Sequence, residues 1–270
     1  MKPLCFDSVT LVPPTLRGKA VLAASHGGTY VADVALRLGL GGLIVSDAGI
    51  GRERAGVAGL DRLERHGVPA AAVSVHSAPI GDGSACFMRG VISVVNGTAR
   101  SIGIKGGMGA REALAMLSQD PQELVGPTPE LNGDHREVRE TIGSGVVVIN
   151  SNSMVASSDE SSIVVTGSHG GLLGGRADTA VKWPVVAAIY NDAGGGIDGA
   201  GYSRLPALDV QSIPAATVST WSARIGDGRS TLDDGYVTHI NACAEAVGAE
   251  IGISCKELVA RLVEWKQKRS

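Results

Sequence analysis

The chain has 270 residues, 44% of them hydrophobic and 19% charged, which is enough to bury a core without disulfides or structural metals. Its formal charge is -3 and its Lys and Arg residues are scattered, so we expect neither nucleic acid nor an anionic membrane as a partner. It has no signal-peptide pattern, no membrane-length apolar run and no CxxC spacing among its cysteines, which predicts a cytoplasmic protein with reduced thiols.

The first half of the chain alternates between predicted strands and predicted helices. Apolar runs rich in β-branched residues predict strands, and apolar residues at helical spacing predict helices. In chain order these are a short segment at 8–12, a strand at 20–24, a helix at 31–38, a strand at 42–45, a helix through Val57, Leu60 and Leu63, a strand at 70–75, a β-like run at 91–95, and helices around Ala99 and Glu112. Glycine-bordered polar motifs follow the three strands, namely SHGG at 25–28, DAG at 47–49 and IGDG at 80–83.

The stretch 119–144 separates this half from the next. It carries Pro121, Pro127 and Pro129, followed by a charged run at 134–140. This composition is typical of a linker that ends in a solvated face. We therefore expect two units, at 1–118 and 145–270.

The second half repeats the first. A shift of roughly 145 positions places DAG and IGDG on 192–194 and 225–228, and about 27 of the 71 residues from 47 to 117 match their partners. A shift smaller by two places SHGG on 168–171. The second copy has a short segment at 145–150, predicted strands at 163–166, 185–189 and 215–220, and a β-like run at 236–240.

This order of elements predicts an α/β fold: a tandem duplication of a Rossmann-like unit with mainly parallel sheets, packed about a pseudo-twofold axis. Ligands of such sheets bind beyond the carboxyl ends of the strands. All three motifs follow strands, so we expect them to line one common edge and to form a ligand pocket there.

The SHGG motif has three possible roles. Ser25 and Ser168 sit between small residues at a strand end, a setting that resembles a nucleophile elbow. The backbone N–H groups of the motif suit an anion cradle equally well, and a third role is a tight turn whose serine caps a helix. The repeated histidines, His26 and His169, argue against the third role alone, since a turn needs no imidazole.

The other motifs offer carboxylates and further polar groups. Asp47 and Asp192 each suit a general base, a partner for the histidine or a helix cap. The second copy alone adds Asn191, Arg224 (in place of Pro79) and His239 (in place of Val94), so we place the working site there. The paired histidines and aspartates would supply a metal site only if the two edges face one another. Because HExxH and CxxC patterns are missing, we predict no metal. Neither GxGxxG nor a P-loop pattern occurs in a strand-to-helix context, so we leave the cofactor open.

The function predicted from these groups is a small-molecule hydrolase that cleaves an amide or ester of an anionic substrate. Ser168 would attack, His169 would move the proton and Asp192 would orient the histidine. The expected substrate-binding residues are Ser25, His26, Asp47, Gly170, Gly171, Asn191, Arg224, Asp227 and His239. Two alternatives stay open, a non-catalytic binder or sensor of a small anionic metabolite and an acid/base isomerase or lyase. A homo-oligomer is the expected assembly.

Overall fold

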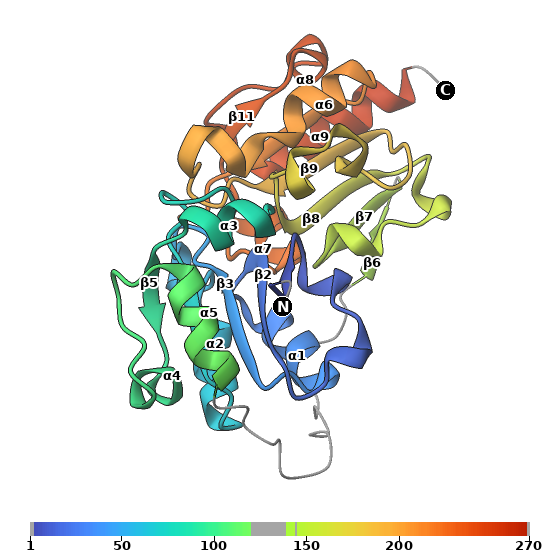
Figure 1. Cartoon of the computed structure of the whole chain (residues 1–270). Helices are drawn as coiled ribbons and strands as arrows, with labels where there is room; N and C mark the ends of the chain where they lie inside the picture. Colours follow the sequence, from blue (N-terminus) through green and yellow to red (C-terminus); the bar gives the residue numbers. More distant parts are fainter. Residues whose placement is uncertain (1–2, 120–138, 144, 269–270) are drawn as a thin grey trace.

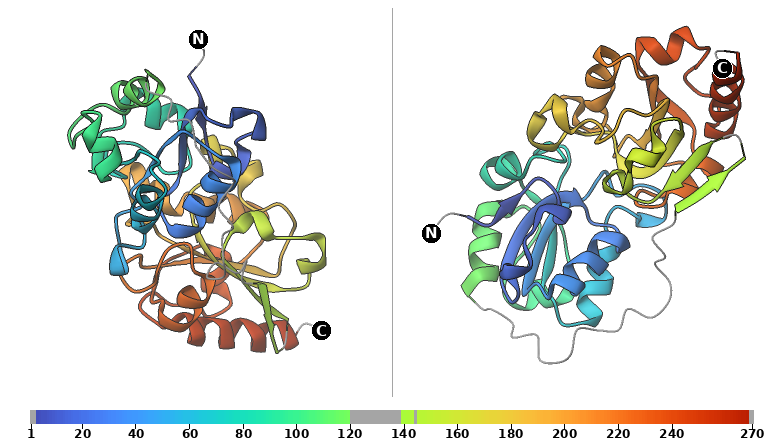
Figure 2. Two further views of the ribbon diagram at one scale, coloured as in Figure 1. Left: turned by 90° about the horizontal axis from the view of Figure 1, so that it is seen from below. Right: turned by 90° about the vertical axis from the view of Figure 1, so that its right-hand side faces the viewer.

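Two α/β units make up the structure, a computed structural model in which residues 3–119, 139–143 and 145–268 are described. Figure 1 shows the first unit, in blue and green, below the second unit, in yellow to red. The two further views in Figure 2 show the same separation, with the loops of each unit pressed against the other.

The first unit has a five-stranded sheet whose strands follow one another in chain order. They are β1 (Cys5–Phe6), β2 (Ala20–His26), β3 (Gly42–Ser46), β4 (Ala70–Val73) and β5 (Ile92–Val95), of which β1 to β4 run parallel and β5 antiparallel. One face is covered by α1 (Thr29–Leu38) and α2 (Ala58–Arg65). The other face is covered by α3 (Gly83–Arg89), α4 (Gly97–Ser101) and α5 (Ala110–Gln119).

The second unit repeats this arrangement with one more strand. Its sheet contains β6 (Arg139–Ile142), β7 (Val146–Ile149), β8 (Ile163–His169), β9 (Ala187–Asn191), β10 (Ala215–Val218) and β11 (Val237–Ile240). Strands β7 to β10 are parallel, and β6 and β11 pair antiparallel at the two edges. One face is covered by α6 (Arg204–Val210) and the other by α7 (Gly228–Asp234), α8 (Ala242–Ala246) and α9 (Cys255–Gln267).

Short 3-10 helices complete the two units. They are η1 (Val9–Leu11), η2 (Pro14–Leu16), η3 (Arg52–Arg54), η4 (Asn152–Met154), η5 (Ser157–Asp159), η6 (Leu173–Gly175), η7 (Ala177–Thr179) and η8 (Ile197–Tyr202). The 3-10 turns η6 and η7 occupy the chain between β8 and β9, where the first unit has the full helix α1. The second unit therefore lacks one of the helices that cover the first.

The predicted α/β fold with mainly parallel sheets is confirmed. The structure adds two local details. The segment at 8–12 forms the 3-10 turn η1, and the edge strand lies earlier, at β1. Of the predicted linker 119–144, Gln119 ends α5, residues 139–142 form β6 and Gly143 is in a turn. Residues 120–138 and 144 lie outside the described residues. No described helix combines the length and the apolar character that a membrane crossing requires.

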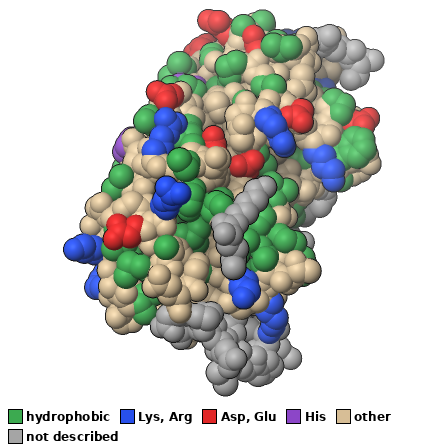
Figure 3. Space-filling view, viewed as in Figure 1, with side chains coloured by type: hydrophobic (Ala, Val, Ile, Leu, Met, Phe, Trp, Pro, Cys, Tyr) green, Lys and Arg blue, Asp and Glu red, His purple; other side chains and the backbone are tan. Residues whose placement is uncertain are grey.

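Charged side chains do not gather into a single patch on the face seen in Figure 3, where Lys and Arg lie among Asp and Glu. Between the units lies an apolar cluster to which both contribute. It consists of Ala48, Val75, Ile80, Ala193, Ala200 and Ile225, and we call it the inter-unit cluster. This cluster holds the carboxyl ends of the two sheets against each other.

Candidate functional site

The motif loops of the two units meet at the boundary between them. Backbone hydrogen bonds cross this boundary in corresponding positions, from Arg52 N to Thr220 O (2.8 Å) and from Ile197 N to Val75 O (2.9 Å). Each bond links the loop after the DAG motif of one unit to the strand end that precedes the IGDG motif of the other. The loops that we expected to border an open pocket therefore form much of the contact between the units.

Glycines make this close contact possible. A Cβ on Gly49 would lie 2.9 Å from the Cα of Gly194, and both residues have left-handed φ angles, 70° and 74°. A Cβ on Gly170 would lie 2.7 Å from the carbonyl oxygen of Gly201, within the second unit. The glycines of the motifs thus serve backbone packing, where any larger residue would collide.

His26 and His169 are buried and neutral. The Nδ1 atom of each ring accepts the backbone N–H two residues later, from Gly28 and Gly171, at 3.1 Å in both cases. An accepting Nδ1 places the ring proton on Nε2. Burial lowers the pKa of His26 to about 4. Burial also lowers the pKa of His169 well below its ordinary value, with a further contribution from the positive charge of Arg204.

The SHGG serines tie each strand end to a neighbouring 3-10 turn. Ser25 Oγ accepts the N–H of Val9 (3.0 Å), and Ser168 Oγ accepts the N–H of Asn152 (2.8 Å). Ser168 and His169 are consecutive residues of β8, so their side chains leave the strand in different directions. Within the described parts of the chain, no hydrogen bond joins Ser168 to His169.

Asp47 and Asp192 make the same hydrogen bonds through Oδ1 and different ones through Oδ2. The Oδ1 atom of each accepts two backbone N–H groups at corresponding positions. Asp47 Oδ2 also accepts the hydroxyl of Ser93 (2.8 Å), so both of its oxygens are occupied. The matching hydroxyl of Thr238 instead bonds Thr217. No described residue gives Oδ2 of Asp192 a hydrogen bond, nor is Asp192 bonded to His169.

Asn191 and Asp227 hold loops in place. Asn191 accepts the N–H of Ala193 (2.9 Å) and donates to the carbonyl of Ala223 (3.2 Å). Asp227 caps α7 by accepting the N–H of Ser230 (2.9 Å). Both roles are structural.

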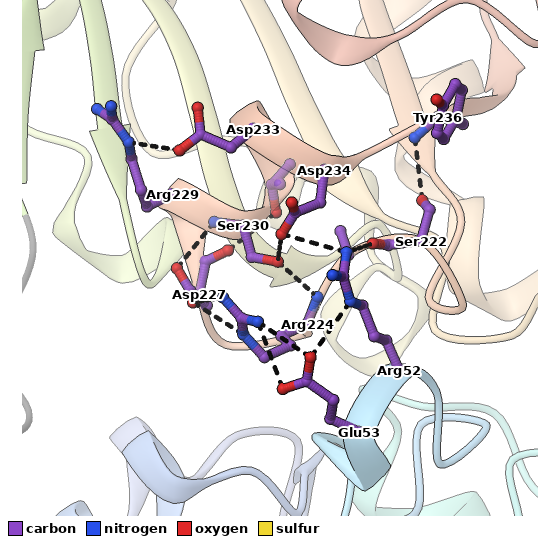
Figure 4. A network of polar contacts seen from close by, with 12 residues as sticks. Arg52, Glu53, Ser222, Arg224, Asp227, Arg229, Ser230, Asp233, Asp234 and Tyr236 are labelled. Atoms are coloured by element: carbon purple, nitrogen blue, oxygen red, sulfur yellow. Dashed lines mark hydrogen bonds and ion pairs between the residues drawn. The ribbon is translucent and has the colours of Figure 1, made fainter.

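Arg224 belongs to an ion-pair network at the boundary (Figure 4). Its guanidinium lies 3.2 Å from Asp227 and 3.3 Å from Glu53 of the first unit. Arg52 of the first unit reaches Asp234 of the second at 3.3 Å. Asp227 and Glu53 already neutralise the positive charge of Arg224, which we expected to hold an anionic substrate.

A row of polar side chains crosses the α6 face of the second sheet. Thr217 of β10 is in register with Tyr190 of β9 on one side and with His239 of β11 on the other. Tyr190 and Thr217 are fully buried, and His239 is partly buried. We call these residues the polar row. The corresponding residues of the first unit are apolar, namely Val45, Ala72 and Val94.

Arg204 lies above this row and is only 2% exposed. Its guanidinium carbon is 5.5 Å from the centre of the Tyr190 ring, and its Nη1 donates to the carbonyls of Thr179 and Ala180 at the end of η7. Its Nε is buried without a hydrogen-bond partner in the described chain. The first unit has Gly59 at this position.

His239 has the surroundings of a general base. Its ring stacks on Tyr202 at 3.8 Å between centroids and an angle of 18°, and its Nδ1 lies 3.3 Å from the Thr217 hydroxyl. Burial lowers the pKa of His239, and the negative charge of Asp192 partly opposes this shift. The imidazole is therefore neutral and able to accept a proton at neutral pH.

His239, Asp192 and His169 were among the residues predicted from the sequence, whereas Tyr190, Tyr202, Thr217 and Arg204 were not. A signal was present, because each missed residue replaces a small or apolar residue of the first copy. Reading those replacements as one site requires the register of β9, β10 and β11, which the sequence does not contain.

The described residues contain no group of three His, Cys, Asp or Glu side chains placed to hold a metal ion. Comparisons of the chain with models of protein families, with curated proteins and with solved structures found no match.

Proposed function

We propose that the second unit is the working half of a small-molecule enzyme that transfers a proton, an isomerase or lyase. His239 would be the general base, and the charge of Asp192 would stabilise the imidazolium once the proton is taken. The ligand would lie at the carboxyl edge of the second sheet, on the face of the polar row. This choice follows the acid/base alternative left open by the sequence.

The contrast between the two units carries the proposal. The same strands carry Val45, Ala72 and Val94 in one copy, and that copy needs no polar group there to fold. Buried polar side chains need partners, and the row has them, since Tyr190 bonds Ala180 and Thr217 bonds Thr238. Apolar side chains fill the same places in the first copy without such partners, so the fold alone does not call for the polar row. Asp192 Oδ2, which accepts no hydroxyl from Thr238, supports the same proposal, because this oxygen keeps its capacity to accept a hydrogen bond.

A hydrogen-exchange assay tests this proposal without knowledge of the substrate. Small carboxylic acids with a C–H next to a carbonyl are incubated with the protein in D₂O, and loss of the C–H signal is followed by proton NMR. We expect exchange with at least one compound and a loss of about 10²- to 10⁴-fold in His239→Gln. Unchanged exchange in this variant would rule out His239 as the base.

Two further measurements sharpen the test. Asp192→Asn keeps the Oδ1 acceptor and removes the charge, so the pKa of His239, followed by NMR, should fall further below 6.5 than in the wild type. Attack by Ser168 stays a prediction. Ser168→Ala should leave proton exchange intact, whereas a hydrolase that uses this serine as its nucleophile would lose turnover.

A further inference from the structure

Arg204 is a cation that the described chain leaves without a counter-ion. Arginine stays protonated at all ordinary pH values, and a buried charge is costly unless it is paired. With 2% of its surface exposed, Arg204 is shielded from bulk solvent. Its protein partners are two neutral carbonyls, of Thr179 and Ala180, and the ring of Tyr190.

The unused part of the guanidinium is the edge that recognises carboxylates. Nη1 is occupied by the carbonyls at the end of η7, whereas Nε has no partner and no hydrogen bond from Nη2 to a described residue is present. Nε and Nη2 share one side of the planar group. Two parallel N–H groups on such an edge match the two oxygens of a carboxylate.

The surroundings favour a single negative charge. His169, whose pKa Arg204 lowers, is neutral, and the carbonyls and ring beside the guanidinium add no positive charge. A phosphate dianion would bring an excess negative charge into this buried place, whereas a monocarboxylate would balance Arg204. Tyr190, which lies below Arg204, and His239 are two strand spacings apart, about 10 Å. The distance from the guanidinium to the imidazole therefore suits a small molecule.

We propose that the Nε and Nη2 edge of Arg204 binds the carboxylate of a small monocarboxylic acid. The inference deepens the proposed function, on which it rests for the reaction, by naming the substrate class and the group that anchors it. Nη1 of Arg204 is bonded to the end of η7, in the segment that carries η6 and η7. That segment stands where the first unit has helix α1.

The Arg204 Nε–H resonance, observed by ¹H–¹⁵N NMR of the full chain, tests the binding step directly. Sodium acetate, a two-carbon monocarboxylate, is titrated from about 1 to 100 mM against sodium chloride of equal ionic strength. This range covers the weak affinity of so small a ligand. We expect a saturable shift of this resonance with acetate and none with chloride. The Arg62 Nε–H is the internal control, since it already donates to Asp33.

Other results would overturn the inference. They are an unshifted Arg204 resonance at the highest acetate concentration, an equal response to chloride, and a response to inorganic phosphate but not to acetate. Arg204→Gln should bind acetate at least tenfold more weakly, by thermal shift. If that variant does not fold, the wild-type resonance still decides the question.

The same titration in His239→Gln separates this inference from the proposed function. We expect acetate to shift the Arg204 resonance in this variant as in the wild type, because His239 does not touch the guanidinium. Acetate binding without proton exchange in the wild type would leave the carboxylate site standing and would refute the proposed reaction. Proton exchange without an acetate response would refute the carboxylate site and leave the proposed reaction standing.

Discussion

At the scale of single residues, the buried histidines link folding to pH. His26 and His169 are neutral in the folded protein because burial disfavours the imidazolium. The unfolded chain has no such restriction, so acid favours unfolding. A histidine whose folded pKa is depressed contributes its full stabilisation above the unfolded pKa and loses it as the pH falls.

We expect the free energy of unfolding to fall by about 3 kcal/mol between pH 6.5 and pH 4 through His26 alone, because its pKa is lowered from 6.5 to about 4. Urea denaturation at a series of pH values measures this. His26→Asn keeps an acceptor near the position of Nδ1 and cannot titrate, so its pH dependence should be flatter by that amount.

The exposed His76 is the matched control, and His76→Asn should keep the wild-type pH dependence. His169 continues to titrate in the single variant, so some dependence remains. An unchanged slope in His26→Asn would show that His26 is not buried as a neutral ring.

At the scale of elements, the loops after the DAG motifs have the same unusual backbone in both units. Ala48 and Ala193 have φ angles of 48° and 49°, and Ile50, a β-branched residue, has a φ of 64°. Such conformations cost free energy and persist only where the surroundings hold them. Contact with the other unit supplies those surroundings.

Gly49→Ala should destabilise the protein by at least 2 kcal/mol more than Gly67→Ala. Both glycines have a φ of 70°, so an alanine adds the same backbone strain at either site. Only at Gly49 would the new Cβ collide, with Gly194 of the other unit; at Gly67 nothing lies within 4 Å. Urea unfolding of the two variants measures the difference, and equal losses would contradict the close approach of the units.

The order of elements along the chain and the placement of the motifs after strands could be predicted from the sequence. Apolar runs such as 20–24 and 42–45 are typical of buried strands, and the duplication supplied most elements twice. The contact between the two edges could not be predicted, because Gly49 and Gly194 are distant in the chain and their approach depends on packing. That contact explains why so many motif residues hold backbone instead of facing solvent.

The candidate site could be predicted only in part. His239 and Asp192 were visible as polar residues that follow or lie in strands of the more polar copy. Arg204 was not, because an isolated arginine in a sequence is normally solvent-exposed and only the fold shows that it is buried. Arg224 was assigned to the substrate for its charge, and its partner Glu53 lies in the other unit.

At the scale of the whole molecule, the units share a core and should unfold together. All three tryptophans, Trp183, Trp221 and Trp265, belong to the second unit. Tryptophan fluorescence therefore follows that unit alone, whereas far-UV circular dichroism follows both. Coincident denaturation curves are the expected result.

Leu60→Ala makes this test stringent. Leu60 is buried in the first unit, on α2, and its truncation should cost about 2 to 5 kcal/mol. If the units unfold together, Leu60→Ala also shifts the denaturation curve that tryptophan fluorescence records for the second unit. The exposed Val210→Ala is the control and should shift neither curve. If Leu60→Ala leaves the tryptophan denaturation curve unchanged, the units unfold independently.

The meeting of Gly49 with its own counterpart Gly194 has one more consequence. Two separate, identical chains joined in this way would be obliged to carry every substitution on both sides. Joining the copies in a single polypeptide removes that obligation, so one half can carry His239 and Arg204 where the other carries Val94 and Gly59. Duplication thus allows two halves of the same fold to differ in their side chains.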